Sequence, residues 1–306
     1  MAAPDLILHH YPRSPFAEKI RVAFGLKGLR WCSVEQPRIA PKPQLVPLTG
    51  GYRRIPVLQI GADIYCDTRL ILAELERRFP DPSFYPPGTR GAADMIAGWA
   101  DQALFATALG LVFGINGDRF PAELHADRAS FTAGKFDGWN SEKMRPHVPS
   151  LRSELSHHLR WIDASLMEAG PFILGSMPSL ADVAVYHSLW YLRGNLGEAE
   201  GLTRHPRVLD WMNRIAAIGH GQGVAMSTEA ALSTARDAEP VEINDGGSEW
   251  SPGTPLAVTP TDWGFDTVTG LCAIADPLRV ALRRDDPQTG RTVVHFPRIG
   301  FAVAPL

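Results

Sequence analysis

The stretch His10–Gly28, HYPRSPFAEKIRVAFGLKG, predicts the end of a strand followed directly by a helix. Ser14 is a good N-cap there, and Pro15 suits the first helical position, where its missing N–H costs nothing. A helix start offers unpaired backbone N–H groups and a partial positive charge, which favour an anion such as a thiolate, although Ser14 as a plain cap stays an alternative. Helical spacing places Phe16, Ile20, Ala23 and Phe24 on the packed face and points Glu18, Lys19 and Arg21 away from it.

Composition narrows the class of protein. The chain has 306 residues, 45% of them hydrophobic and 21% charged, which is ordinary for globular proteins and leaves room for two or three domains. A net charge of -3 argues against nucleic acid or an anionic membrane as the main partner. We find no signal peptide and no apolar run near the length of about 18 residues that a bilayer requires. The expectation is therefore a cytoplasmic protein with a small-molecule or protein partner.

The three cysteines are scattered and form no CxxC pair. An odd number without a pair supports neither a disulfide framework nor a zinc site, and no other metal-ligand pattern stands out. We expect reduced cysteines that serve packing, and no metal. They are Cys32, Cys66 and Cys272.

Around the opening stretch, the first 80 residues alternate short apolar runs with one further helical pattern. Prolines and the Gly50-Gly51 pair interrupt residues 36–54, whereas the Gly61-Ala62 pair predicts a tight hairpin turn. The predicted order is strand 6–8, helix 15–27, strand 31–34, a connection with a short helix near 42–48, strands 57–60 and 64–66, and a helix that ends before Pro80.

This order resembles the thioredoxin-like glutathione-binding domain of cytosolic glutathione transferases, and three motifs carry the resemblance. They are YPRSPFAEKIRVA at 11–23, RRIPVLQI at 53–60 and YCDTRLILAELE at 65–76. The resemblance implies that Ser14 is the catalytic hydroxyl, which stabilises the glutathione thiolate. A free thiol with a pKa of about 8.5 is only a few per cent ionised at neutral pH, so lowering its pKa supplies the nucleophile.

The other two motifs imply how glutathione itself is held. Pro56 is expected to follow a cis peptide, with the backbone of Ile55 paired to the cysteinyl residue; a trans proline at an edge strand is the alternative. Asp67 and Thr68 stand where the family usually has Glu-Ser, and would bind the γ-glutamyl end, unless they only cap a helix. The implied glutathione contacts are Phe16, Arg54, Ile55, Pro56, Asp67 and Thr68.

One departure from the family bears on the chemistry. The SPF sequence looks most like the omega-type pattern, in which a cysteine occupies the position of Ser14. Serine cannot form a mixed disulfide with glutathione, so thiol transfer and dehydroascorbate reduction are disfavoured, and conjugation or isomerisation is favoured. Tyr11 is a second candidate for the activating hydroxyl, with packing at the strand end as its alternative role.

Residues 81–91, DPSFYPPGTRG, predict a linker into a helical domain. Helices are expected over 92–112, over a long leucine-rich stretch ending near 166, and over 206–218, whereas 113–149 gives no firm assignment. Ser179 with Asp182 predicts a capping-box start of a central helix, a structural role. Trp99, Phe105 and Phe113 are candidates for a substrate wall, although apolar residues at helical spacing more often belong to a core.

The resemblance ends near residue 222, and a polar linker, ARDAEPVEINDGG at 235–247, follows. Five short runs separated by turn residues then predict an antiparallel, barrel-like β module. Its acids Asp262 and Asp266 fit turns better than a metal, and Arg279, Arg283, Arg284 and Arg291 fit a solvated face better than a binding surface. The runs are 255–259, 271–275, 278–283, 292–296 and 300–303.

Together these features predict a multidomain α+β chain: a thioredoxin-like domain over 1–80, an all-α domain over 91–222 and a small β domain over 238–306. The resemblance implies a homodimeric glutathione transferase, with glutathione as co-substrate and a small hydrophobic electrophile. A binding or scaffold protein that works through its β module, without catalysis, is the main alternative. Peroxide or disulfide reduction is a third.

Overall fold

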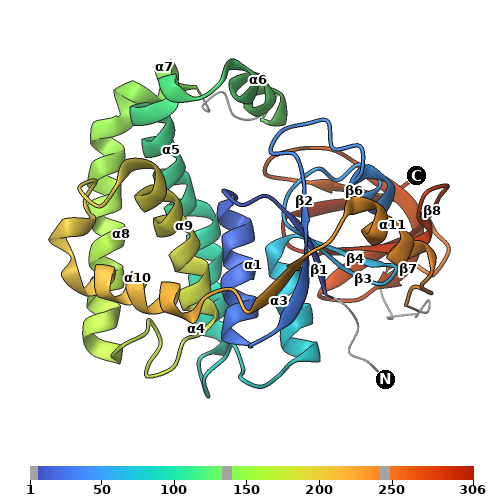
Figure 1. Cartoon of the computed structure of the whole chain (residues 1–306), viewed down its shortest axis with the longest axis horizontal. Coiled ribbons are helices and arrows are strands. Elements are labelled where there is room, and N and C mark those ends of the chain that lie inside the picture. Colours follow the sequence, from blue (N-terminus) through green and yellow to red (C-terminus); the bar gives the residue numbers. More distant parts are fainter. Residues whose placement is uncertain (1–5, 133–139, 242–248) are drawn as a thin grey trace. The chain divides into compact units, whose positions relative to one another are not determined.

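The computed structural model describes residues 6–132, 140–241 and 249–306, and the chain divides into two compact units (Figure 1). Unit 1 comprises Met1–Ile20, Leu29–Arg77 and Gln222–Leu306, and unit 2 comprises Arg21–Gly28 and Arg78–Gly221. Residues 238–306, predicted as a separate domain, thus share a compact unit with the N-terminal strands.

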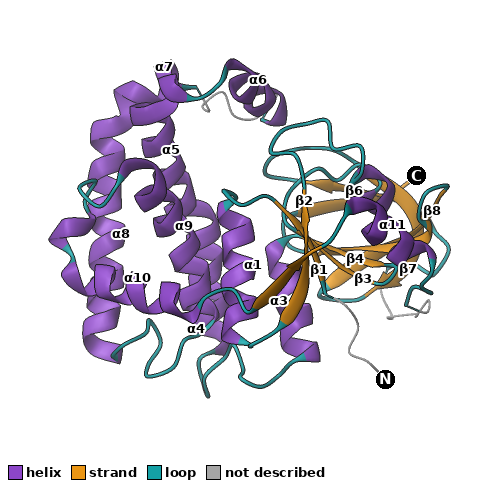
Figure 2. Ribbon diagram, in the orientation of Figure 1, coloured by secondary structure: helices purple, strands orange, loops and turns teal. Residues whose placement is uncertain are grey.

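The described strands of unit 1, orange in Figure 2, form one sheet. Their order in the sheet is β10-β6-β7-β8-β9-β4-β3-β1-β2-β5. The strands are β1 (Ile7–His10), β2 (Arg30–Glu35), β3 (Val57–Ile60), β4 (Asp63–Cys66), β5 (Gln222–Ala225), β6 (Pro255–Pro260), β7 (Val268–Ala275), β8 (Arg279–Asp286), β9 (Gly290–Pro297) and β10 (Phe301–Pro305).

The N-terminal strands have the predicted thioredoxin-like arrangement. Strand β1 runs parallel to β2 and antiparallel to β3, and β3 runs antiparallel to β4. All residues of β1, β3 and β4 are buried, as expected for apolar strands covered on both faces. Strand β5 pairs in parallel with β2 and was not predicted, because its four residues are all exposed and carry no alternating pattern.

The five predicted C-terminal strands are present, and neighbours from β6 to β10 pair antiparallel. Strand β9 continues the sheet by pairing in parallel with β4, from Asp63↔Val293 to Tyr65↔His295. The barrel-like closure is not among the strand pairings of the described residues; instead the added strands cover what would be the open edge at β4. In Figure 1 the orange C-terminal strands continue the sheet beyond β4.

Among its described residues, unit 1 also has three short helices and the start of α1 (Pro15–Leu26). Helix α2 ends at Gly50, whose φ of 73° is left-handed, and a Cβ there would lie 2.4 Å from the Arg284 guanidinium carbon. Gly50 therefore serves both the turn and the close approach of a C-terminal strand. The helices are α2 (Val46–Thr49), α3 (Thr68–Arg78) and α11 (Thr228–Arg236).

The prediction that the charged side chains of α1 point away from the packed face is wrong. Glu18, Lys19 and Arg21 are all buried. In the case of Lys19, the amine donates to the hydroxyl of Thr68 at 3.3 Å, so a buried polar partner compensates for lost water. Helical spacing alone does not show such partners.

Unit 2 is helical, as predicted, with α5, α8 and α9 side by side in Figure 1. Helices α6 and α7 occupy the stretch without a sequence assignment, of which 133–139 lies outside the described residues. The part of the predicted polar linker at 242–247 also lies outside them. The elements are α4 (Arg90–Trp99), the π-helix η1 (Ala100–Leu104), α5 (Phe105–Asn116), η2 (Gly117–Arg119), α6 (Ala122–Phe131), α7 (Ser141–Met144), η3 (Arg145–His147), α8 (Val148–Ala169), α9 (Leu180–Leu196), η4 (Leu202–Arg204) and α10 (Pro206–Ile218).

The capping box at the start of α9 is confirmed. Asp182 accepts the main-chain N–H of Ser179 at 2.9 Å and its hydroxyl at 2.7 Å. Its carboxylate also accepts from Trp211 Nε1 and from the N–H of Ile173, both at 2.8 Å. Burial raises the pKa of Asp182, and these four hydrogen bonds oppose that shift. The pair is structural, because every one of its contacts holds unit 2 together.

The helical stretch from α4 to η2, Arg90–Arg119, is long and apolar enough to cross a membrane by length and composition. The expectation that the chain has no such run is therefore wrong. Most of its most apolar part is buried within the structure, which is also the situation of a core helix, so the finding is weak support for a membrane span.

Candidate functional site

The start of α1 is built as the sequence predicts, with Ser14 as its N-cap. The Ser14 hydroxyl oxygen accepts the N–H of Ala17, the third helical residue, at 3.2 Å, and the side chain is 2% exposed. The Ser14 N–H donates to the carbonyl of Tyr11 at 3.1 Å, which turns the chain from the strand into the helix. A hydroxyl that accepts one hydrogen bond still carries a proton to donate, so capping and binding an anion are compatible.

The second motif lies at the entrance to β3. The Ile55–Pro56 peptide is cis, as the family resemblance implied, and Pro56 is buried. Ile55 is half-buried and packs against the apolar core of unit 1. Its main chain therefore stands at the start of a strand, where it can pair with an added extended peptide.

The third motif joins β4 to α3. Asp67 has a φ of 73°, a left-handed conformation that is uncommon outside glycine and is often found at functional positions. Its carboxylate accepts the N–H of Arg69 at 2.9 Å, and its carbonyl accepts the N–H of Ile71. Thr68 is the first residue of α3 and is buried, so its hydroxyl lies at a helix start with positive partial charge.

Lys19 is a component of this site that the sequence reasoning missed. Its side chain is 0% exposed, and its amine donates to the Thr68 hydroxyl oxygen at 3.3 Å. This contact joins the helix that carries Ser14 to the helix that begins at Thr68. An ammonium that fills one lone pair of the hydroxyl leaves the Thr68 proton for an acceptor such as a carboxylate.

Arg54 is placed differently from the expectation of a simple glutathione contact. Its guanidinium donates to the carboxylate of Asp262 and to the carbonyl of Trp263, both in the loop between β6 and β7. It also lies 5.9 Å from the ring centres of Tyr52 and Phe301. The loop between these two C-terminal strands therefore binds the Arg54 side chain.

Two aromatic residues named from the sequence flank the start of α1. Phe16 and Tyr11 are both half-buried. The Tyr11 ring centre lies 5.9 Å from the Lys42 amine, a cation–π arrangement that fits a packing role at the strand end.

Cys66, which lies within the third motif, does not offer an activated thiol. Cys32, Cys66 and Cys272 form no disulfide bond, and the last two are buried. Burial raises the pKa of the Cys66 thiol well above its ordinary value, and the neighbouring Asp67 carboxylate adds to that shift. Cys66, although within the third motif, stays protonated and does not replace the cysteine that Ser14 has displaced.

No group of three or more His, Cys, Asp or Glu residues able to hold a metal occurs in the part of the chain that the structure describes. Of the three candidate wall residues in unit 2, Phe105 and Phe113 are buried, and they pack against His187 and Phe120 respectively. Trp99 is half-buried and lies edge-on to His158 at 5.3 Å. Phe105 and Phe113 are thus core residues of their unit.

The thioredoxin-like strands with a cis proline, followed along the chain by an all-helical unit, define a glutathione-transferase-type protein. Sequence comparison agrees: the model of the glutathione S-transferase N-terminal domain matches residues 8–83, and that of the C-terminal domain matches residues 139–214. Among solved structures, a GST-like protein from Pseudomonas syringae is 37% identical, with a TM-score of 0.78, and the match covers 99% of this chain and 100% of that one. The chain therefore belongs to the glutathione S-transferase family.

Two further solved structures support the fold alone, because their sequence identity is low. A glutathione S-transferase from Rhodospirillum rubrum is 19% identical, with a TM-score of 0.54, covering 69% of this chain and 88% of that one. A glutathione S-transferase from Methylobacterium radiotolerans, in complex with glutathione sulfonate, is 24% identical, with a TM-score of 0.50, covering 72% and 97%. No curated protein matches the chain.

Proposed function

We propose that this chain is a glutathione transferase that activates the glutathione thiol for attack on a small hydrophobic electrophile. The observation that carries the proposal is the Ser14 hydroxyl, buried at the start of α1, with its oxygen already accepting the Ala17 N–H. Family membership supports glutathione as the ligand, as does the glutathione sulfonate bound to the Methylobacterium radiotolerans relative.

Ser14 would act on the bound thiol by donating its hydroxyl proton in a hydrogen bond to the sulfur. Such a bond, together with the partial positive charge of the helix start, favours the thiolate over the thiol and lowers the thiol pKa. The thiolate then attacks an electrophilic carbon, a carbon–sulfur bond forms, and a leaving group departs with its electron pair. In a cis–trans isomerisation the sulfur adds transiently to the substrate double bond, rotation occurs about the resulting single bond, and the sulfur then leaves again.

The remaining residues would orient glutathione. The main chain of Ile55 pairs with the cysteinyl residue, and the Asp67 carboxylate accepts from the γ-glutamyl ammonium. Thr68, with its oxygen occupied by the Lys19 amine, donates its proton to the γ-glutamyl carboxylate. Positioning both reactants in this way removes much of the entropic cost of a bimolecular reaction.

Serine at this position argues against thiol transfer by the protein itself. A mixed disulfide needs a protein thiolate, and Cys66 stays protonated. Peroxide or disulfide reduction is therefore the weaker enzymatic alternative. A disulfide substrate other than glutathione disulfide tests it, with glutathione supplied as the reductant that is itself oxidised to glutathione disulfide.

The decisive experiment compares two serine caps. In α11, the Ser227 hydroxyl accepts the N–H of Ala230 at 3.2 Å. The distance equals that between Ser14 and Ala17, and the donor is again an alanine at the third helical position, but Ser227 is exposed. Glutathione binding by calorimetry and conjugation of an aryl chloride would be measured for the wild type, Ser14→Ala and Ser227→Ala. We expect binding and turnover in the wild type, loss of turnover in Ser14→Ala, and no loss in Ser227→Ala.

Each outcome has a defined meaning. A wild-type protein that neither binds glutathione nor turns over the aryl chloride is a binding or scaffold protein, and the proposal fails. Full activity in Ser14→Ala refutes only the assignment of Ser14, and Tyr11→Phe then tests the second hydroxyl. We also propose a homodimer, which analytical ultracentrifugation tests.

A further inference from the structure

Two connections of the C-terminal strands reach the residues that flank the proposed glutathione contacts. The β6–β7 loop, residues 261–267, contacts Arg54, which directly precedes Ile55. The β9–β10 turn, residues 298–300, accepts a hydrogen bond from Arg69, which directly follows Thr68, at 3.3 Å to the Ile299 carbonyl. The added strands thus meet both the cysteinyl and the γ-glutamyl parts of the site.

The contact at Arg54 is the more elaborate of the two. The Arg54 side chain is only 14% exposed, whereas its ion-pair partner Asp262 is 50% exposed. The Asp262 carboxylate also accepts the N–H of Trp263 at 2.9 Å. This hydrogen bond within the loop orients the carboxylate that accepts from the Arg54 guanidinium. A planar guanidinium held by a carboxylate and a carbonyl has little freedom to turn toward a ligand.

The charges around this contact act on one buried ring. Burial is the main cause that raises the pKa of the Tyr52 hydroxyl. The charges of Arg54, Asp67 and Asp262 also shift the pKa of Tyr52. The Asp262 side chain of the β6–β7 loop therefore belongs to the same electrostatic environment as Asp67 of the third motif.

The two connections are fixed to each other and to the sheet. The N–H of Thr261 donates to the carbonyl of Gly300 at 2.9 Å, which joins the β6–β7 loop to the β9–β10 turn. Below them, Phe296 and Phe301 pack against Tyr52 in the apolar core that Ile55 also contacts. The β6–β7 loop is therefore a firm support for Arg54.

We propose that the C-terminal strands are part of the glutathione site: Asp262 and Trp263 hold Arg54, and Arg54 thereby fixes the main chain of Ile55 for pairing with glutathione. This inference rests on the proposed function. Arg54 and Asp262 are positioning residues, since they act through Ile55 and not on the reacting sulfur. The added strands thus bear on how tightly glutathione binds.

The proposal makes a different prediction from direct binding of glutathione by Arg54. Asp262→Ala removes the ion pair of the Arg54 guanidinium and leaves only the Trp263 carbonyl as its acceptor, so direct binding predicts unchanged or tighter glutathione binding. A positioning role predicts weaker binding, by about tenfold in Kd and in KM for glutathione, the size expected for one charge-assisted hydrogen bond. At saturating glutathione, kcat should stay within about twofold, because the bound thiol still meets Ser14.

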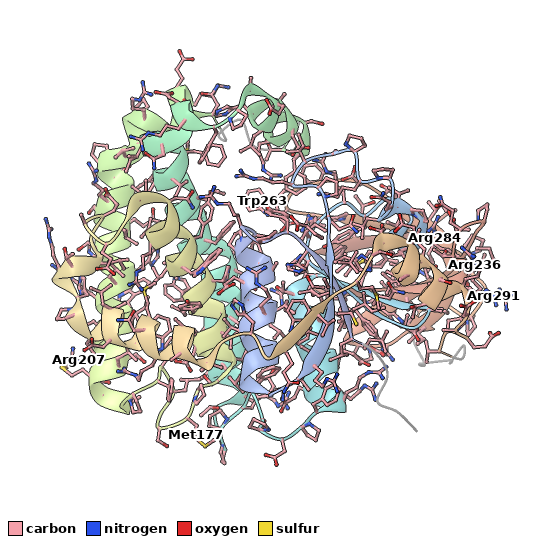
Figure 3. All side chains as sticks on the ribbon, viewed as in Figure 1. Met177, Arg207, Arg236, Trp263, Arg284 and Arg291 are labelled. Carbon is pink, nitrogen blue, oxygen red and sulfur yellow. The ribbon has the colours of Figure 1, made fainter. Side chains whose placement is uncertain are left out.

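The experiment uses the full chain, with calorimetric titration of glutathione and of glutathione sulfonate, steady-state kinetics and a thermal melt. Asp262→Asn retains an oxygen acceptor for Arg54, so it should keep most of the affinity. Asp285→Ala is the matched control, because Asp285 pairs with Arg291 on the same added strands and is 73% exposed. In Figure 3, Arg291 lies well apart from Trp263.

An exposed or half-exposed ion pair adds little stability, so the melting temperature of Asp262→Ala should stay near that of the control. Weaker glutathione binding in Asp262→Ala, with affinity retained in Asp262→Asn and Asp285→Ala, supports the inference. If the wild type binds glutathione and Asp262→Ala binds it with the same affinity, the inference is overturned and the proposed function still stands. Absence of binding in the wild type overturns both.

Discussion

Two helices of this chain start at a buried serine, α1 at Ser14 and α9 at Ser179, and they differ at the third helical residue. In α9 this residue is Asp182, whose carboxylate accepts the Ser179 hydroxyl at 2.7 Å and its N–H at 2.9 Å. In α1 it is Ala17, which has no side-chain acceptor, and its N–H donates to the Ser14 oxygen at 3.2 Å. The Ser179 hydroxyl proton is already donated to Asp182, whereas the Ser14 hydroxyl proton can be donated to a ligand.

The comparison teaches that the residue type and its helical position do not decide the role of a capping serine. A carboxylate three residues on converts the hydroxyl into part of the scaffold. Without that carboxylate, the same hydroxyl stays available for chemistry at a helix start that already favours an anion. Variants at and around the two serines test this distinction.

The largest effect is expected at the structural serine's partner. Asp182→Ala leaves four buried donors without their acceptor, two on Ser179 and one each on Ile173 and Trp211, and should destabilise unit 2 by roughly 3 to 5 kcal/mol. Urea unfolding followed by near-ultraviolet circular dichroism measures the change. Asp210→Ala is the control, because Asp210 is exposed on α10. A loss below about 1 kcal/mol would contradict the structural role assigned to Ser179 and Asp182.

We expect acid to destabilise unit 1, which carries Ser14. Burial lowers the pKa of His9 to about 4, although its hydrogen bond with Gln59 opposes this shift. Burial also lowers the pKa of His295. The unfolded chain, with histidine pKa values near 6.5, therefore takes up protons at higher pH than the folded chain does.

Stability from His9 is thus complete above about pH 6.5 and is lost as the pH falls toward 4, by on the order of 3 kcal/mol. Hydrogen exchange of β1 and β3 between pH 7 and pH 4 locates the loss in unit 1. In His9→Asn the pH dependence should flatten, and an unchanged slope would show that His9 is not the group that titrates.

At Ser14, the proposed catalytic residue, two effects should appear together in Ser14→Ala. Loss of one hydrogen-bond donor to the thiolate should lower kcat/KM about a hundredfold, as at other anion-stabilising sites. Loss of the cap should cost about 1 kcal/mol of stability. Titrating the thiolate of bound glutathione by its ultraviolet absorbance should show a raised thiol pKa in Ser14→Ala. An unchanged thiol pKa would place Ser14 beside Ser179 as a purely structural cap.

A smaller effect is expected for the second helix start of the same site. Lys19→Met removes the amine that donates to Thr68. It therefore removes the contact that, under the proposed function, leaves the Thr68 proton for the γ-glutamyl carboxylate. We expect about tenfold weaker glutathione binding, by calorimetry, with kcat little changed. Lys27→Met is the control, a lysine on the residues that follow α1, whose amine donates to the carbonyls of Phe79 and Pro82. Equal losses in both variants would argue against a specific role of Lys19.

Much of the fold could be predicted from the sequence because each element carries a local signal. Ser14-Pro15 predicts a helix start, and the Gly61-Ala62 pair predicts a hairpin turn. Turn residues separate the C-terminal runs and so predict separate strands. The pairing of β9 with β4 could not be predicted, because strands more than 200 residues apart leave no periodic signal of their partnership. The buried contact of His295 with Asp63, at 2.8 Å, belongs to that pairing.

The candidate site was likewise predicted where its signals are local and missed where they depend on partners. The position of Thr68 at a helix start follows from its neighbours in the sequence. Lys19 lies on the polar side by helical spacing, and nothing nearby indicates that Thr68 buries its amine. Asp262 fits a turn, as predicted, and only the fold brings it to Arg54.

The smallest effect is expected at a third serine, which isolates the cost of a cap from the chemistry of a site. Ser227 accepts the N–H of Ala230 at 3.2 Å with the geometry of Ser14, but at an exposed helix start. Ser227→Ala should cost about 0.5 to 1 kcal/mol in urea unfolding and leave kcat/KM and the thiol pKa of bound glutathione unchanged. If its stability loss equals that of Ser14→Ala while only Ser14→Ala loses activity, the two functions of Ser14 are separable. If Ser227→Ala also loses activity, the loss follows from a weakened unit 1 and not from a missing proton at the sulfur.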